Sequence, residues 1–460
     1  MTFDTDLVHH FAKSVAHTTF DQLSESAREA AKKSMLDTLG VILAASGMEP
    51  AVRGIIEIVE EAGGTKEATK IGFGGQAPAI MAALANGALA HCLDYDDQTP
   101  WGQHCSSSIV PAVMAVAERR GGITGKEMIT AVAVGQDIFA RLRTNVGWLK
   151  DWNLSTVLAV FGATAAAARA YGLDEKQIGH ALGIASMQSS GIMEMIAGRG
   201  SDLRGMYAGF SSKGAVLATL MASKGTTGID KMFEGQYGFF NSYFGGRYDR
   251  DKILADLGSN FLGEGTLYKR WPCVGTAHSH MKAAIDIITE NNVALSDIET
   301  IKLHVGDYHD LMCQPMAERC APATLADAKF SLPFLVATAI VRNGMSVSDF
   351  TAAGLKDTAV LNVAAKMELV NDPKLNWTLE LPPGRVEITL KDGRSWLAVG
   401  THVPGNADAP MDWDQVIAKF TECASVSAEP ISTDRISTAA KLAQHLEEAT
   451  DATQLIKLLG

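Results

Sequence analysis

The chain has few of the features that mark secreted, membrane or zinc-binding proteins. Its 460 residues include six cysteines with no CxxC spacing, so we expect neither a disulfide framework nor a zinc ribbon. No window reaches about 18 uninterrupted apolar residues, and the N-terminal MTFDTDLVHHFAKSVAHTTF contains acidic side chains and no apolar core. The sequence therefore predicts neither a membrane span nor a secretion signal, and we expect a cytoplasmic protein.

Positive charge is also scarce. The 40 Lys and Arg residues are outnumbered by 52 Asp and Glu, which gives a formal net charge of -12 and argues against a nucleic-acid partner. Hydrophobic residues make up 47% and charged residues 20%, as in an ordinary globular enzyme. A chain of this length is expected to form more than one domain.

The first half of the chain has a helical pattern from Leu23 to about Gly225. Ser26 and Glu29 are predicted to form a capping box before the first long helix, which ends near Gly47. Many of the helices are rich in Ala and Gly on several faces, which indicates burial among other helices. The further helices that we expect span 79–89, 107–118, 126–142, 158–171, 175–186 and 213–224.

The pattern changes after about Leu267. Segment 299–305 alternates as a half-buried strand does, and Lys391-Asp392-Gly393 predicts a hairpin between strands 385–390 and 394–399. Helices are expected at 281–290, 325–342 and 359–366, and the chain returns to helix after Asp412. The fold class predicted is mostly α with an α+β part.

The most polar stretch between long apolar segments is AHCLDYDDQTPWGQHCSSSIVPA, from Ala90 to Ala112. In a helix, His91, Asp94 and Asp97 would share one face and Asp96 would point elsewhere. Two close carboxylates separate their pKa values, so one of them can hold a proton near neutral pH and act as an acid or base. A solvated acidic loop is the alternative.

His104 opens the segment HCSSS, where a helix N-terminus would offer backbone N–H groups to an anion. A serine acting as a plain N-cap explains the same pattern. A mixed metal site of His91, Asp94, His104 and His278 is conceivable, but no compact motif supports it, and we predict no metal.

Two further segments carry candidate residues. The glycine-rich stretch 198–209 lacks the preceding strand that a nucleotide-binding loop requires, but Arg204 could hold a carboxylate in a bidentate contact. A surface arginine in a turn is the alternative. Lys269 and His278 lie where the helical and mixed regions meet, and such junctions often form clefts. A buried structural histidine is the alternative for His278.

Taken together and in this order, six segments resemble the MmgE/PrpD family, which includes 2-methylcitrate dehydratase, cis-aconitate decarboxylase and iminodisuccinate epimerase. They are ANGALAHCLDYDD, the His-x-Ser at His104, VFGATAAAARAYGLD, the helix entry Gly209 to Gly214, KRWPCVGTAH and PATLADAKFSLPF. The resemblance implies a large helical domain formed by residues 1–267 and 406–460, with a smaller α+β lid domain at 268–405. It also implies a homodimer that needs no organic cofactor and acts on small di- or tricarboxylates.

The resemblance places Asp94, His104 and His278 at family active-site positions. The chain departs from the family at other positions: Gln98 stands for a threonine, Asn153 for a histidine, Arg204 for a lysine, Tyr207 for a histidine, and Phe334 for a tyrosine found in some members. Positive charge is thus kept at Arg204, while groups that titrate near neutral pH are lost around it.

The function that follows is a cofactor-independent, dehydratase-like lyase for a small di- or tricarboxylic acid. Arg204, Lys269 and Lys213 are expected to hold carboxylates, with Gln98, Asn153 and Asp97 also facing the substrate. His104 or His278 would move the proton, with Asp94 or Tyr207 on the other side. Three alternatives stay open: an epimerase or isomerase, a decarboxylase, and a relative that binds a carboxylate without catalysis. A metal-dependent hydrolase is a more remote one.

Overall fold

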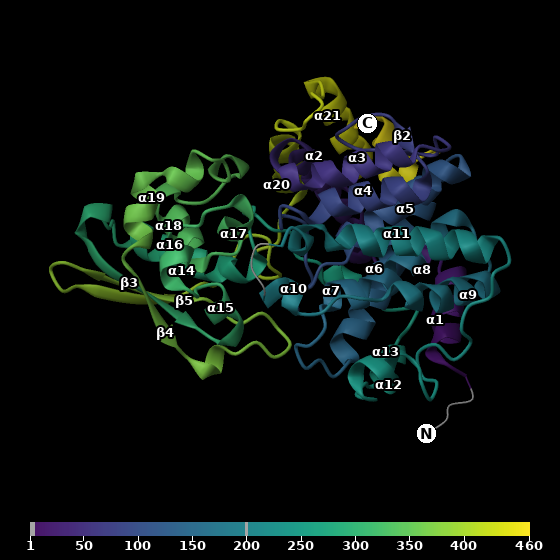
Figure 1. Cartoon of the computed structure of the whole chain (residues 1–460), viewed down its shortest axis with the longest axis horizontal. Helices are drawn as coiled ribbons and strands as arrows, with labels where there is room; N and C mark the ends of the chain where they lie inside the picture. The colour runs from purple at the N-terminus through teal and green to yellow at the C-terminus, as the bar shows by residue number, and fades with distance from the viewer. Residues whose placement is uncertain (1–4, 198–200) are drawn as a thin grey trace.

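The computed structural model describes residues 5–197 and 201–460, and most of them are helical. A larger helical part carries the N-terminus, and a smaller part combines helices with a four-stranded sheet (Figure 1). The predicted fold class, mostly α with an α+β part, is confirmed.

The larger part is a set of closely packed helices around an alanine-rich core. A Cβ atom added at Gly135 would lie 2.7 Å from the carbonyl oxygen of Gly162, so glycine at both positions lets two helices touch along their backbones. The main helices of this part are α1 (Leu7–His17), α2 (Glu25–Met48), α4 (Ala79–His91), α5 (Ser106–Arg120), α6 (Gly125–Asn145), α8 (Ala159–Tyr171), α9 (Glu175–Ala185) and α11 (Leu203–Ser223).

Two helix starts differ from the prediction. The N-cap of α2 is Ser24, whose hydroxyl accepts a hydrogen bond from the Ala27 N–H at 3.1 Å, so the box predicted at Ser26 is wrong. Helix α11 begins at Leu203 and not near Lys213. Its glycines suit a close approach to α4, since a Cβ at Gly209 would lie 2.5 Å from the Leu84 carbonyl oxygen.

The smaller part is built on a sheet of strand order β4-β3-β5-β6. Strand β3 pairs parallel with β4 and antiparallel with β5, and β5 pairs antiparallel with β6. The predicted hairpin is confirmed, with Gly393 at φ 88° in its turn. The bounds of these strands and of two packing helices are β3 Ile298–Val305, β4 Met367–Asn371, β5 Arg385–Leu390, β6 Ser395–Val399, α14 His278–Glu290 and α18 Leu332–Arg342.

The single helix predicted over 325–342 is two helices. Helix α17 (Leu325–Lys329) ends before Phe330, and α18 begins after Ser331. The Ser331 hydroxyl accepts a hydrogen bond from the Phe334 N–H at 3.2 Å and caps the second helix. The break places Phe330 beside the pocket described below.

The C-terminal helices α20 (Trp413–Ala424) and α21 (Thr433–Gln444), yellow in Figure 1, pack back on the larger part. A Cβ at Gly40 of α2 would lie 3.2 Å from the Phe420 Cα, so the contact between α2 and α20 is tight. The Lys419 ammonium on α20 lies 2.7 Å from Asp37 Oδ1. This buried ion pair connects α20 to α2, and the same ammonium donates to the Tyr95 carbonyl oxygen at 2.6 Å, in the polar stretch that carries the site.

One stretch, Leu154–Tyr171, is apolar and long enough to cross a bilayer, and the bent pair Glu25–Met48 and Pro50–Ala62 passes the same test when taken together. In Leu154–Tyr171, 89% of the residues are buried inside the protein, as in an ordinary core helix.

Candidate active site

A pocket opens where the two parts of the molecule meet. It takes residues from the polar stretch after α4, from segment 148–155, from the start of α11 and from the smaller part. The residues that line it are His91, Asp94, Gln98, Gly102, Gln103, His104, Trp148, Asn153, Leu154, Ser155, Met193, Ile196, Arg204, Tyr207, Val274, Gly275, Thr276, Tyr308, Phe330 and Trp377.

The backbone after α4 decides which acidic side chains face this pocket. Helix α4 ends at His91, and Asp94 has a left-handed φ of 49°. The prediction that His91, Asp94 and Asp97 share a helix face is therefore wrong. Asp94 lines the pocket and Asp97 does not, while Asp96, which the sequence suggested would point elsewhere, lies between two histidines.

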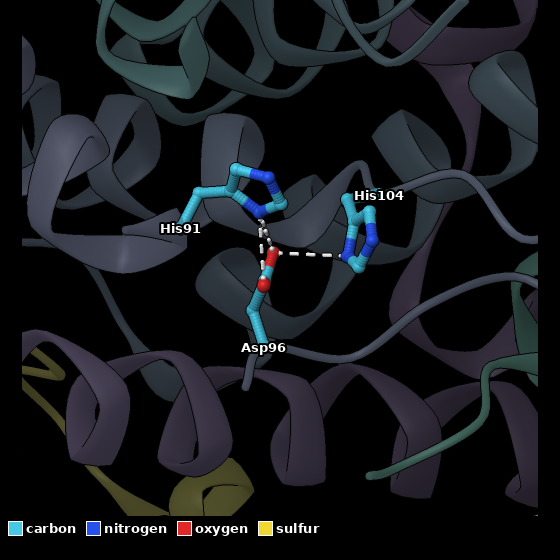
Figure 2. Close-up of side chains that lie close together, drawn as sticks. All are labelled: His91, Asp96 and His104. Carbon is cyan, nitrogen blue, oxygen red and sulfur yellow. Dashed lines mark hydrogen bonds and ion pairs between the residues drawn. The ribbon is translucent and has the colours of Figure 1, made fainter. Parts of the chain in front are cut away.

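His91, Asp96 and His104 form one buried cluster (Figure 2). The His91 Nδ1 lies 3.0 Å from both Asp96 carboxylate oxygens, and the His104 Nδ1 lies 3.2 Å from Asp96 Oδ2. Burial opposes ionisation of Asp96, but the two histidines outweigh it and hold its pKa well below the usual value. Asp96 is thus a fixed negative charge that orients both imidazoles.

The orientation of His104 leaves one ring nitrogen for chemistry. Its Nδ1 is 2.7 Å from the Asp97 carbonyl oxygen, an acceptor that requires a proton on this nitrogen. The other nitrogen, Nε2, lies 3.7 Å from Asp94 Oδ1 on the pocket side. The His104 backbone N–H donates to Ser155 Oγ at 3.2 Å, which ties the histidine to the opposite segment.

The same cluster has the residue types of a metal site. Ligand atoms of His91, Asp96 and His104 lie within 4.8 Å of one another, close enough to share an ion. Protons on the two Nδ1 atoms already account for the short contacts, and the His104 Nδ1 is held by a carbonyl oxygen. These residues fit a hydrogen-bonded cluster better than a metal centre.

Lys269 does not reach the pocket as a free cation, so its predicted role of holding a carboxylate is not supported. Its ammonium contacts the Asp94 carboxylate and lies 2.6 Å from the Asp94 carbonyl oxygen. Burial would raise the pKa of Asp94, but Lys269, helped by His104 and His91, lowers it to about 2. Asp94 is therefore ionised beside His104 Nε2 and is no proton donor at neutral pH.

Asp97 points away from the pocket, so the predicted contact with substrate is not supported. Its N–H donates to Asp37 Oδ2 at 3.0 Å, and its side chain is 1% exposed. Burial, followed by the charge of Asp37, raises the pKa of Asp97 to about 8. The acid that holds a proton near neutral pH is thus Asp97, but outside the site.

Arg204 brings positive charge to the pocket from the first turn of α11. Its guanidinium stacks 3.4 Å from the ring centroid of Phe330, and Nη1 donates to the Ile196 carbonyl oxygen at 2.8 Å. Its buried Nε has no hydrogen-bond partner among the described residues. The guanidinium therefore keeps donor capacity for a ligand oxygen.

Of the other predicted residues, Gln98, Asn153 and Tyr207 line the pocket. The Tyr207 ring lies 4.2 Å from that of His91, and burial raises the pKa of its phenol well above 10. His278 and Lys213 do not line this pocket.

His278 lies behind the pocket wall. The centroid of its ring is 5.2 Å from that of the Trp271 ring, and its Nε2 has no hydrogen-bond partner among the described residues. Burial lowers its pKa to about 3. The structure also places Phe334 in the core of the smaller part and not at the pocket. Of the glycine-rich stretch, residues 198–200 lie outside the described residues.

Sequence reasoning missed an aromatic wall. The ring centroids of Trp148 and Trp377 are 5.5 Å apart, and those of Tyr308 and Trp377 are 4.8 Å apart. These residues come from distant segments and share no motif, so nothing in the sequence joined them. The contact of Asp96 with the histidines could have been predicted from the sequence. Three carboxylates so close to two histidines cannot all point in one direction, so one of them was bound to face the imidazoles.

Comparison with known proteins gives two family matches. Residues 9–251 match the MmgE/PrpD N-terminal domain, and residues 271–444 match the MmgE/PrpD C-terminal domain. Similar curated proteins include the cis-aconitate decarboxylase of Aspergillus terreus, 26% identical over 85% of this chain and 83% of the relative. The cis-aconitate decarboxylase of Homo sapiens is 23% identical over 83% of this chain and 79% of the relative. That of Mus musculus is 22% identical over 98% of this chain and 92% of the relative.

Proposed function

We propose that this chain, which belongs to the MmgE/PrpD family, is a lyase that decarboxylates a small di- or tricarboxylic acid in the pocket between its two parts. The similar proteins named above are cis-aconitate decarboxylases, which supports a lyase of this kind. The reaction then depends on two functions of the pocket, a cation that binds a carboxylate and a group that delivers a proton.

Arg204 binds the carboxylate in this proposal. Apart from histidine, it is the one cation among the described residues that line the pocket, and its Nε has no hydrogen-bond partner among them. A planar guanidinium can hold a carboxylate by two parallel hydrogen bonds, which fixes orientation as well as charge. Stacking on Phe330 at 3.4 Å keeps the guanidinium plane in place.

His104 delivers the proton. In the decarboxylation the bond from carbon to the leaving carboxylate breaks, CO2 departs, and the electron pair remains on carbon. A proton from His104 Nε2 then forms the new C–H bond, and solvent restores the proton. Asp94 and Asp96 place a carboxylate on each side of the imidazole, and these contacts fix the orientation of the ring.

The single observation that favours decarboxylation over the other reactions is the position of the side chains that can donate or accept a proton. Epimerisation needs bases on two faces of one carbon, and dehydration needs a base together with an acid for the leaving hydroxyl. Among the described residues that line the pocket, the imidazoles are those of His91 and His104, whose rings lie 4.7 Å apart on one carboxylate. Protons therefore arrive from one side, which suits decarboxylation.

The remaining properties are proposed from the family resemblance. They are a cytoplasmic homodimer, and a reaction that needs neither metal nor organic cofactor. Activity that survives extensive dialysis against a chelator would support the second, and its loss with recovery on adding one metal ion would overturn it.

The test measures CO2 release from cis-aconitate and from a panel of small di- and tricarboxylic acids. His104→Ala should lower turnover about 10²–10⁴-fold, the usual worth of a positioned acid or base. His445→Ala, at a histidine with a 61% exposed side chain, is the control and should leave the rate unchanged. Near-wild-type turnover by His104→Ala would overturn the assignment.

Two further results decide between the alternatives. His278 was predicted to be catalytic and lies outside this pocket wall, so we expect His278→Ala to keep most of the activity. Formation of an alkene without CO2 from a hydroxy acid would instead show a dehydratase.

A further inference from the structure

Behind the pocket wall, Arg143 carries a buried positive charge that takes no part in the proposed reaction. It lies on α6 and is 2% exposed. Its Nε donates to Gln103 Oε1, and its Nη2 lies 3.3 Å from the Trp101 carbonyl oxygen. No carboxylate among the described residues forms an ion pair with it. Burial lowers its pKa to about 10, so it stays charged at neutral pH.

Arg143 determines how Gln103 faces the pocket. A side-chain amide has one oxygen acceptor and one NH2 donor, and a guanidinium offers donors only. The Gln103 oxygen must therefore face Arg143, which leaves Nε2 on the other side. Gln103 lines the pocket, and no described residue accepts a hydrogen bond from its Nε2.

A second amide, that of Asn153, also lines the pocket. Asn153 Oδ1 accepts a hydrogen bond from the Ser155 N–H at 3.0 Å, and the buried Nδ2 has no partner among the described residues. Asn153 is 5% exposed and lines the pocket. The hydrogen bond from the His104 N–H to Ser155 Oγ holds the two amide-bearing segments together.

We propose that Gln103 and Asn153 form a second subsite, which binds one carboxylate of the substrate while Arg204 binds another. Two N–H donors without protein acceptors suit an oxygen ligand. The unpaired charge of Arg143 behind them favours an anionic one. The inference rests on the proposed function for the role of Arg204.

Other buried cations near the site do not supply a third anchor. Lys269 is neutralised by Asp94, and the Lys329 ammonium lies 2.9 Å from Glu49 Oε2. The pocket therefore offers two anion-binding positions, one at Arg204 and one at the amides.

Isothermal titration calorimetry on the full chain tests the subsite with matched probes. Succinate and glutarate are compared with butyrate and pentanoate, which lack the second carboxylate. We expect Gln103→Leu to weaken both dicarboxylates about 10- to 100-fold, as for a hydrogen bond to a charged group, and to leave the monocarboxylates unchanged. Gln454→Leu, at an exposed glutamine on α22 (Gln454–Lys457), is the control.

Arg143→Met tests the orientation of the amide. As a single substitution it should lower the affinity for the dicarboxylates. In the Gln103→Leu background most of that loss should disappear, because Arg143 acts on the ligand by orienting the Gln103 amide, which this variant lacks. A merely structural role would lower the affinity for all four acids together. Equal weakening of mono- and dicarboxylates, or no weakening of either, would overturn the subsite.

The outcomes separate this inference from the proposed function. If wild type releases CO2 from an acid and Gln103→Leu binds all probes as wild type does, the subsite is wrong and the function stands. If Gln103→Leu selectively weakens dicarboxylates while His104→Ala keeps full turnover, the subsite stands and the catalytic assignment is wrong.

Discussion

Asp97→Asn should stabilise the protein, and increasingly so as the pH rises. The carboxyl group is 1% exposed and adjoins Asp37, and burial, followed by that charge, raises its pKa from 3.8 to about 8. The hydroxyls of Ser34 and Ser106 counteract the shift only in part. In the folded protein the group is therefore neutral at pH 7, and an amide has the same shape and charge as the protonated acid.

The sign follows from proton binding. Between pH 4 and pH 8 the unfolded chain has released this proton and the folded chain retains it. The free energy of unfolding of wild type then falls by about 1.4 kcal/mol per pH unit from this group alone. Over the whole interval the free energy of unfolding of wild type falls by at most about 5 kcal/mol, and that of the variant does not fall from this cause. For a chain of this size that corresponds to a Tm difference of about 5 °C.

The assay is thermal unfolding of wild type and Asp97→Asn from pH 5 to pH 8.5. The Tm of the variant minus that of wild type should rise with pH. The variant Asp251→Asn, at an exposed carboxylate, should show no such trend. A Tm difference that is constant over the range, or that falls with pH, would refute the reasoning that the buried acid is protonated.

Four further substitutions test packing and buried charge, each by unfolding measurements. Gly209→Ala should destabilise by about 2 kcal/mol or more because its Cβ meets the backbone of α4 at 2.5 Å, whereas Gly54→Ala, in open space on helix α3 (Arg53–Ala62), should stabilise by about 0.5–1 kcal/mol. Lys419→Met should destabilise by about 3 kcal/mol because it leaves Asp37 buried without its cation; an unchanged Tm would contradict this. Lys269→Met should raise the pKa of its carboxylate partner, so its loss of stability relative to wild type should grow from pH 4 to pH 7, and a pH-independent loss would argue against the ion pair.

The periodicity of the sequence was sufficient to predict most of the fold. Alanine- and glycine-rich helical patterns identified the buried helices, and strand alternation with Lys391-Asp392-Gly393 identified the hairpin. Helix boundaries that depend on a single hydrogen bond were less predictable. At the start of α2 the sequence offers both Ser24 and Ser26 as the N-cap, and the structure uses Ser24. The early start of α11 was missed because glycine lowers helix propensity, and only the close contact with α4 compensates.

The family and the importance of the stretch from Ala90 to Ala112 were determined by the sequence alone, because they depend on residue identity and order. Which of its side chains act together was decided by the tertiary structure. A left-handed residue at Asp94 breaks the expected helical face, so Asp96 contacts the histidines and Asp97 turns into the protein. The Lys269 ammonium contacts the Asp94 carboxylate and is therefore not available to a ligand. The pocket also needs Arg204 and the aromatic wall, whose segments come together only when the two parts of the molecule pack.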